Sequence, residues 1–270
     1  MNYLLILAFI SLALSAPDPN FHVYLAFGQS NMQGMAKPEQ EDMTCPERFK
    51  MMAAIDMPSS GRKKGEWYTA VPPLCRDGTG LSPCDYFGRE LVENLPEEIT
   101  VGIINVAVAG CSIDLFDEDK ASSYLSSQGL WLGFIAKEYG NNPYKVLVEA
   151  AKKAQESGVI KGILLHQGES DMGDKNWPNN VKKIYERLLK DLGLDGSEVP
   201  LLVGEVVDSA VGGVCGAHNS IIATIPDVIP NSHVVKSTML KAASDNIHFS
   251  TSSYREMGKR YAQIMLGLLK

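Results

Sequence analysis

The sequence contains no cluster of basic residues that could attract a polyanion. Its 270 residues include 25 Lys and Arg against 32 Asp and Glu, which gives a formal net charge of −7 at pH 7. Nucleic acids and anionic membrane surfaces are therefore not expected as partners, because both would be repelled by this charge. A neutral or weakly charged substrate fits the charge balance better.

Internal repeats, low-complexity tracts and linker-like segments are also absent from the sequence. Without such a break, residues 17–270 are predicted to form a single domain, which is long enough to bury a large core. The five cysteines have spacings that match no zinc-binding pattern, so no metal site is predicted.

Residues 1–16 have the features of a secretory signal peptide. Their apolar core runs from Leu4 to Leu14, which is too short to span a bilayer comfortably, and small residues follow at Ser15 and Ala16. No Lys or Arg precedes this core, and a buried N-terminal helix is the alternative interpretation. As a signal peptide, the segment predicts a secreted protein with no membrane association after cleavage.

Secretion would place the cysteines in an oxidising compartment. Cys45, Cys75 and Cys84 lie in one loop-rich region, and we expect a disulfide among them. Because the total of five is odd, at least one thiol must be free or paired between chains.

Apolar runs rich in β-branched residues alternate with helical patterns along the chain. Nearly all-apolar strands are typical of a parallel sheet that is covered on both faces. We therefore predict an α/β fold, a three-layer α/β/α doubly wound domain with a mostly five-stranded parallel sheet. The predicted strands are Val23–Phe27, Thr100–Val108, Ile160–Leu165, Pro200–Val207 and His233–Ser237. The predicted helices are Asp85–Asn94, Pro143–Ser157, Pro178–Leu192, Cys215–Ile225 and Ser252–Leu269.

Polar and reactive groups follow the ends of several predicted strands. In doubly wound sheets, ligands bind beyond the carboxyl ends of the strands. The groups in question are Gly28-Gln29-Ser30-Asn31, Ala109-Gly110-Cys111-Ser112, His166-Gln167-Gly168-Glu169-Ser170-Asp171 and Ser244-Asp245-Asn246-Ile247-His248. Their convergence predicts an active site at this edge of the sheet.

Three of these residues have the types and spacing that nucleophilic catalysis needs. Gly28 allows a sharp turn that would hold the Ser30 hydroxyl at the rim of the sheet. A serine needs a base close by, and Asp245, three residues before His248, could hold the imidazole Nδ1–H so that Nε2 faces Ser30. For His248 taken alone, a helix-capping or surface role is the alternative.

Three N–H groups could stabilise an oxyanion in acyl transfer, namely the Ser30 amide, the Gly110 amide and the Gln167 side chain. Glu169 and Asp171 are ambiguous. Each could be a second carboxylate for His248, a structural hydrogen-bonding group or a substrate contact, and the structural role is favoured for Asp171.

Gln29, Asn31 and His166 adjoin these groups and are predicted to contact the substrate. For His166, packing or hydrogen bonding beneath the site is the alternative. The other histidines are weaker candidates, because His22 and His233 begin strands at the far edge of the sheet and His218 begins a helix, where a surface position is expected.

Two connections, residues 31–83 and 111–141, are too long to be simple loops and are predicted to shape a cleft. Their aromatic side chains could stack on sugar rings, with packing beneath the loops as the alternative. These side chains are Trp67, Tyr68, Tyr124 and Trp131.

The strand-end segments resemble the ordered sequence blocks of the SGNH-hydrolase carbohydrate esterases. The blocks are Gly28-Gln29-Ser30-Asn31-Met32, Gly110, His166-Gln167-Gly168-Glu169-Ser170-Asp171 and Asp245-Asn246-Ile247-His248-Phe249. The branch that they resemble most is carbohydrate esterase family 6, the acetylxylan esterases, which is related to the sialate O-acetylesterase (SASA) domain. The resemblance spans residues 22–265 and implies a flavodoxin-like SGNH-hydrolase fold.

The resemblance also implies residue roles. Ser30 would be the nucleophile, His248 the general base and Asp245 its orienting acid, with Glu169 as the alternative acid. The Ser30 and Gly110 amides and Gln167 would donate to the oxyanion, although Gln167 stands where the wider superfamily has Asn. No metal or organic cofactor is implied.

The predicted function is that of a secreted serine esterase that hydrolyses O-acetyl esters on plant cell-wall polysaccharide, acetylxylan above all, through an acetyl-enzyme. Deacetylation of sialic acid is the alternative within the same class. A carbohydrate-binding protein without catalysis and a lipase or thioesterase are the alternatives from other classes.

Overall fold

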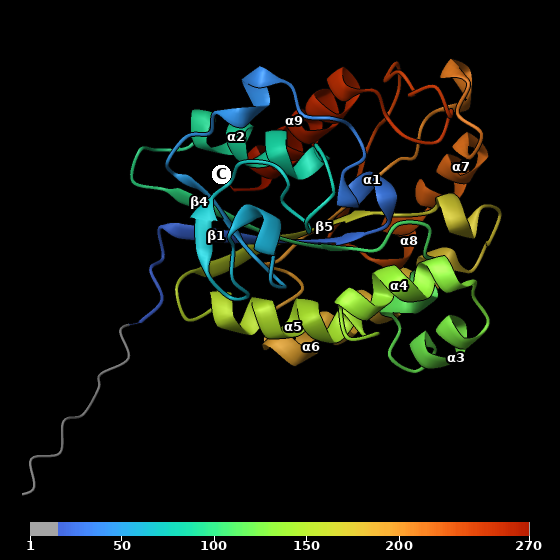
Figure 1. The fold of residues 1–270 in the computed structure, drawn as a ribbon, viewed down its shortest axis with the longest axis horizontal. Coiled ribbons are helices and arrows are strands. Elements are labelled where there is room, and N and C mark those ends of the chain that lie inside the picture. The colour runs from blue at the N-terminus through green and yellow to red at the C-terminus, as the bar shows by residue number, and fades with distance from the viewer. Residues whose placement is uncertain (1–15, 270) are drawn as a thin grey trace, which may run out of the picture.

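The structure is a computed structural model that describes residues 16–269 (Figure 1). The predicted signal peptide, residues 1–16, therefore lies outside the described residues except for Ala16. No helix within the described range is long and apolar enough to cross a membrane.

A mixed sheet of seven strands forms the centre of the protein, in the order β3-β2-β4-β1-β5-β6-β7. Every neighbouring pair is parallel except β2 and β3, which are antiparallel. The α/β class is confirmed and each predicted strand is present, but the predicted count of five strands is wrong. The strands are β1 (Phe21–Gly28), β2 (Phe49–Met52), β3 (Trp67–Thr69), β4 (Thr100–Ala107), β5 (Val159–His166), β6 (Leu201–Gly204) and β7 (Ser232–Val235).

The two additional strands lie within the long connection 31–83. β2 contains no β-branched residue and β3 has only three residues, so neither has the pattern typical of a buried strand. β2 pairs with β4, with Phe49 opposite Val101, and β3 completes the edge of the sheet. Part of the connection that is predicted to shape a cleft therefore extends the sheet.

Helices cover both faces of the sheet, and β1 shows how its side chains are divided between them. Val23, Leu25 and Phe27 pack into one apolar core, while Tyr24 and Ala26 pack into the other. Figure 1 shows α2 and α9 on one side of the sheet and α5 and α6 on the other. Burial on both faces explains why the strands are continuously apolar. The helices are α1 (Ser30–Gln33), α2 (Pro83–Asn94), α3 (Ala121–Ser126), α4 (Leu130–Glu138), α5 (Pro143–Ala154), α6 (Trp177–Leu192), α7 (Asn219–Ile222), α8 (Ile225–Val228) and α9 (Thr251–Leu268).

Four of the predicted helices correspond to α2, α5, α6 and α9, whereas the helix predicted over Cys215–Ile225 is wrong. That segment is broken into a 3-10 turn at Gly216–His218 and the one-turn helices α7 and α8. Pro226 lies in the first turn of α8, where its missing N–H is tolerated, but it could not continue a helix from α7.

All five cysteines are free, so the expected disulfide among Cys45, Cys75 and Cys84 is wrong. The thiols contact different groups instead. Cys75 Sγ lies 3.2 Å from Tyr139 Oη, and Cys84 Sγ lies 3.5 Å from Met32 Sδ. The two most buried thiols of this region therefore serve packing rather than cross-linking.

Asp85, in the first turn of α2, is a fully buried carboxyl group. Its Oδ2 accepts hydrogen bonds from Ser82 N at 2.9 Å and from Ser82 Oγ at 3.0 Å, while Oδ1 has no partner. Burial raises the pKa of Asp85 to about 7, despite the opposing hydrogen bonds from Ser82. The native state therefore binds a proton that the unfolded chain releases near pH 4.

This linkage predicts that wild-type stability falls as the pH rises from about 4 to about 7, by up to a few kcal/mol from this one group. Asp85→Asn should remove that part of the slope. The free energy of unfolding of both proteins, measured by denaturant titration at several pH values, tests this. If the new asparagine side chain lacks a hydrogen-bond partner, this lowers the stability equally at every pH. The test is therefore the change in the free energy of unfolding with pH, not its absolute value. Glu93→Gln, an exposed change on the same helix, should keep the wild-type slope. Parallel pH profiles for Asp85→Asn and wild type would contradict the prediction.

Candidate active site

A cavity of about 340 Å³ opens beyond the carboxyl ends of β1, β4 and β5. Ser30 and His248 both line it, together with Gly110, Glu169 and Ser170. Segments separated by more than two hundred residues in the sequence thus meet at the edge of the sheet where the strand ends predict an active site.

Ser30 is held by the turn that ends β1. Gly28 adopts φ +152°, and a Cβ at this position would lie only 2.1 Å from the carbonyl oxygen of His166, so the backbone approach requires glycine. The amide of Gln29 then donates to His166 O at 3.1 Å, and Ser30 begins α1. As the first residue of a helix, Ser30 keeps its amide N–H without a backbone acceptor in the part of the chain that the structure describes.

Asp245 and His248 form a tightly bonded pair in the loop before α9. His248 Nδ1 donates to Asp245 Oδ2 at 2.6 Å, and Asp245 Oδ1 accepts from the amides of Ile247 and His248, each at 2.9 Å. Partial burial opposes ionisation, but these hydrogen bonds prevail and lower the pKa of Asp245 to about 2. The carboxylate is therefore ionised at neutral pH and orients the ring with Nε2 free.

The structure places Ser30 and His248 on the same cavity but records no hydrogen bond between Ser30 Oγ and His248 Nε2. Nucleophile–base contacts are often long without substrate and shorten when it binds. The arrangement can therefore support acyl transfer once an ester occupies the cavity.

Two of the three expected oxyanion donors belong to residues that line the cavity, Ser30 and Gly110. Neither Ser30 N nor Gly110 N donates to a protein acceptor within the described residues. Gly110 has φ +71°, and its carbonyl oxygen accepts from Ser170 Oγ at 2.9 Å, which holds the peptide in place. Ser30 and Gly110, which both line the cavity, can thus offer two N–H groups to an oxyanion.

Gln167, the third expected donor, does not reach the cavity, so this prediction is wrong for its side chain. Its Nε2 donates to Gln29 Oε1 at 3.1 Å, to Cys111 O at 3.2 Å and to Asp171 Oδ2, and its Oε1 accepts from Trp177 Nε1. Gln167 is fully buried beneath the site and ties the strand-end loops together.

Asp171 has the structural role that the sequence favours. Its Oδ2 accepts from Ile113 N at 3.0 Å as well as from Gln167. Burial raises the pKa of Asp171 to about 6, against the lowering effect of these hydrogen bonds. Asp171 thus links the Glu169–Asp171 turn to the segment after β4.

Glu169 lines the cavity, and its Oε1 accepts from Asn31 Nδ2 while its buried Oε2 has no partner. Burial raises the pKa of Glu169, and the hydrogen bond from Asn31 opposes this. No hydrogen bond joins Glu169 to His248. Among the described residues, Asp245 is the carboxylate that contacts the imidazole.

Asn31 and His166 do not contact the cavity, so the prediction that they bind substrate is wrong. Asn31 is buried, and its amide donates to Ile247 O at 3.1 Å and accepts from Tyr254 Oη at 2.6 Å. His166 is buried against Phe249 and Tyr261, and burial lowers its pKa to about 3. The alternative of packing beneath the site is confirmed for His166.

Gln29, predicted to contact the substrate, lines the cavity, and its side-chain oxygen accepts from Gln167 Nε2 and, at 3.2 Å, from Ser170 N. Its main role in the structure is therefore to join the β1 turn to the loop after β5.

Trp131 is the one aromatic residue of the long connections that lines the cavity. Trp67 packs on Phe21 with ring centroids 4.7 Å apart, and Tyr124 Oη accepts from Ser112 N at 2.8 Å, so both have packing or structural roles. Tyr68 Oη donates to Glu66 Oε2 at 2.8 Å, away from the site.

Several lining residues were not predicted, namely Met35, Ala109, Ser170, Cys215 and Ile247. Ala109, Ser170 and Ile247 lie inside the strand-end segments that predict the site, although no individual role follows from their residue types. Met35 and Cys215 carry no such signal, because only the tertiary fold brings them to the cavity. His218 is buried against Trp177, with ring centroids 5.1 Å apart, so its expected surface position is wrong.

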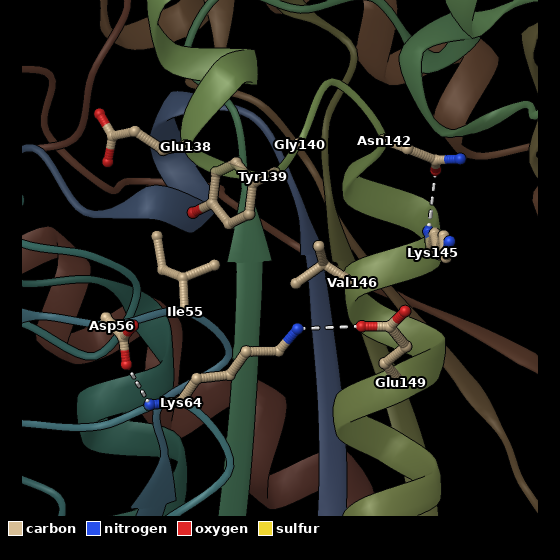
Figure 2. A pocket seen from close by; sticks show the side chains of 10 residues that line it. All are labelled: Ile55, Asp56, Lys64, Glu138, Tyr139, Gly140, Asn142, Lys145, Val146 and Glu149. Atoms are coloured by element: carbon tan, nitrogen blue, oxygen red, sulfur yellow. Dashed lines mark hydrogen bonds and ion pairs between the residues drawn. The ribbon is translucent and has the colours of Figure 1, made fainter.

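A larger cavity of about 500 Å³ lies between the 55–64 segment and α5 (Figure 2). Figure 2 shows Lys64 reaching across it to Glu149, at an Nζ–Oε2 distance of 2.9 Å. No serine, cysteine or histidine lines it, so it lacks the residues that form a Ser–His or Cys–His pair for acyl transfer. Within residues 16–269, no group of three or more His, Cys, Asp and Glu side chains could hold a metal ion.

The sheet and the Ser30 cavity define the class of protein as an esterase with an SGNH-like fold. A family model described as "Carbohydrate esterase, sialic acid-specific acetylesterase" matches residues 20–267. The chain belongs to this family and is a carboxylic ester hydrolase, which confirms the resemblance that the sequence blocks indicate.

Individual relatives are distant in sequence and similar in fold. The Probable carbohydrate esterase At4g34215 of Arabidopsis thaliana is 22% identical over 94% of this chain and 93% of its own. The crystal structure of that Arabidopsis protein has a TM-score of 0.69 at 21% identity, covering 93% of this chain and 99% of the other. The structure of NanS has a TM-score of 0.68 at 16% identity, covering 94% and 99%. These likenesses show a shared fold.

Proposed function

We propose that this protein is a secreted serine esterase that removes O-acetyl groups from neutral plant cell-wall polysaccharide, with acetylxylan as the main substrate. The observation that carries the proposal is the single cavity in which Ser30, His248 and the two unpaired amides of Ser30 and Gly110 come together. These are the groups that acyl transfer needs.

The lining of the cavity favours a neutral substrate over a sialoside. No Lys or Arg is among the residues that line it, and Glu169 adds an acidic group. A sialoside carries a carboxylate, which a protein site usually pairs with a cation or a cluster of N–H donors. A xylan chain needs no such partner.

In the first half of the reaction, Ser30 Oγ attacks the acetyl carbonyl carbon while His248 Nε2 takes its proton. The negative charge that develops on the carbonyl oxygen is accepted by the N–H groups of Ser30 and Gly110, each donor being worth about a hundred- to a thousand-fold in rate. Asp245 stabilises the imidazolium ion by its hydrogen bond to Nδ1. The C–O bond to the sugar then breaks, and the sugar oxygen takes the proton from Nε2.

In the second half, water attacks the acetyl group on Ser30. His248 Nε2 takes a proton from this water, and the same two amides again hold the oxyanion. The bond to Oγ breaks, Oγ recovers the proton from His248, and acetate leaves. No step of this sequence uses a cofactor.

Secretion rests on residues 1–16 alone. The free cysteines provide no additional support for it, because a disulfide would have been the structural sign of an oxidising compartment.

The proposal is tested by acetate release from acetylated xylan and from a 9-O-acetylated sialoside. We expect kcat/KM for the xylan to exceed that for the sialoside by roughly tenfold or more, because the sialoside carboxylate would lie near Glu169 without a cation. The reverse order would assign the protein to sialate deacetylation.

A serine-reactive phosphonate separates an esterase from a carbohydrate-binding protein without catalysis. The expected result is a single adduct on Ser30, found by mass spectrometry after proteolysis. A protein that binds xylan but forms no adduct and releases no acetate would contradict the proposed function.

A further inference from the structure

Helix α4 exposes a row of large apolar side chains. Leu130 is 83% exposed, Trp131 55% and Phe134 70%. Residues three and four positions apart lie on one face of a helix, so the three side chains form a continuous patch, which we call the α4 face. Leu132 and Ala136, on the opposite side, are buried and anchor the helix. An apolar patch of this kind on a protein surface usually marks a binding site.

The α4 face continues directly into the catalytic cavity. Trp131 belongs to both, because it lines the cavity together with Ser30 and His248. One edge of its ring rests on Gly110, where an added Cβ would lie only 2.1 Å from Trp131 Cη2. The ring therefore stands at the rim of the cavity, and more than half of the residue's surface is open to solvent.

The size of the cavity indicates what must lie on this rim. A volume of about 340 Å³ can accept an acetyl group and the sugar that carries it, but not a polysaccharide chain. The remaining sugars of a polymer must leave the cavity across one of its walls. Sugar rings present apolar C–H faces between polar edges, and an aromatic side chain with an open face can stack on such a surface.

The charges of the α4 face also suit a neutral chain. Residues 130–136 contain no charged side chain. A lipid surface is the other candidate occupant, but anionic membranes are not attracted by a protein with a net charge of −7 and no basic cluster.

We propose that the α4 face is a subsite for the polysaccharide chain, in which Trp131 stacks on a sugar next to the acetylated one and Phe134 and Leu130 contact the chain further along. This inference rests on the proposed function and deepens it. It makes the enzyme selective for polymers and long oligosaccharides over acetylated monosaccharides.

The test compares kcat/KM for acetylated xylan with kcat/KM for 4-nitrophenyl acetate, which has no sugar chain. Trp131→Ala should lower the xylan-to-nitrophenyl ratio about tenfold or more, mainly through KM, since the stacking contributes to binding. Phe134→Ser should lower the ratio about threefold or more, and Trp131→Phe should recover part of it. Leu268→Ser, a matched apolar-to-polar change at the exposed end of α9, should leave the ratio unchanged.

A second readout measures binding apart from turnover. The Ser30→Ala variant is titrated calorimetrically with an acetylated xylo-oligosaccharide, with and without Trp131→Ala. The inference predicts at least a tenfold weaker Kd when both substitutions are present. Affinity that depends on Trp131 in a protein whose wild type releases no acetate would overturn the proposed function while supporting the subsite.

Three results would overturn the subsite. Equal losses on xylan and on 4-nitrophenyl acetate would show that Trp131 acts only by supporting Gly110. An unchanged ratio and an unchanged Kd would show that the chain does not touch α4. Unchanged xylan affinity, with Trp131-dependent binding to phosphatidylcholine vesicles, would assign the face to a lipid surface.

Discussion

Ser30→Ala is expected to abolish acetate release, with a fall in kcat of about 10⁴- to 10⁶-fold. The hydroxyl is the only protein group in the proposed mechanism that forms a covalent bond to the acetyl carbon. Without it, His248 and the oxyanion donors could at best promote direct attack by water, which gives a small residual rate. Acetate release from acetylated xylan, followed over long times at high enzyme concentration, measures this residual rate.

The substitution should leave the fold intact, because Ser30 Oγ makes no hydrogen bond to another group within residues 16–269. Thermal unfolding and the binding of a xylo-oligosaccharide should therefore match the wild type.

Ser170→Ala is a matched control, since it removes a hydroxyl from the same cavity. Ser170 Oγ donates to Gly110 O at 2.9 Å and only positions that peptide, so a loss of about tenfold is expected. If Ser30→Ala retained a tenth of the wild-type activity, the assignment of Ser30 as the nucleophile would be wrong.

The central strands could be predicted from the sequence because burial on both faces leaves a local signal. The alternation along β1, with Leu25 directed to one core and Tyr24 to the other, is a run of apolar residues that only a covered parallel strand accommodates. β2 leaves no such signal. Its four residues acquire strand geometry by pairing with β4, fifty residues further along the chain, and local propensity does not report such a pairing.

The same distinction between local signals and long-range contacts applies to the residues of the active site. Asp245 and His248 could be predicted because their contact spans only three residues, and Ser30 because Gly28 marks its turn. Gln167 could not, because its orientation depends on Trp177 and Asp171, whose side chains occupy both ends of its amide.

Asp245→Asn is expected to lower kcat by about 10³- to 10⁴-fold. The asparagine Oδ1 could still accept from the amides of Ile247 and His248, so the loop should keep its shape. Its Nδ2 would then face the imidazole as a donor, and the ring would have to place its proton on Nε2. Nε2 could no longer take the proton of Ser30. Kinetics on 4-nitrophenyl acetate, which needs little substrate binding, measure the loss most directly.

Glu169→Gln is the matched change of a carboxylate to an amide in the same cavity, and we expect a loss of only about tenfold or less, because Glu169 has no hydrogen bond to His248.

The pH dependence of activity then separates the two candidate acids, Asp245 and Glu169. The pKa of Asp245 is about 2, so the wild-type carboxylate is ionised at every usable pH and its own protonation adds no slope to the wild-type pH–rate profile. Burial raises the pKa of Glu169 above its ordinary value. If Glu169 were the acid, wild-type activity would fall as the pH drops through that raised pKa, and its advantage over Glu169→Gln would shrink. A large, pH-dependent loss for Glu169→Gln beside a small one for Asp245→Asn would therefore transfer the role to Glu169.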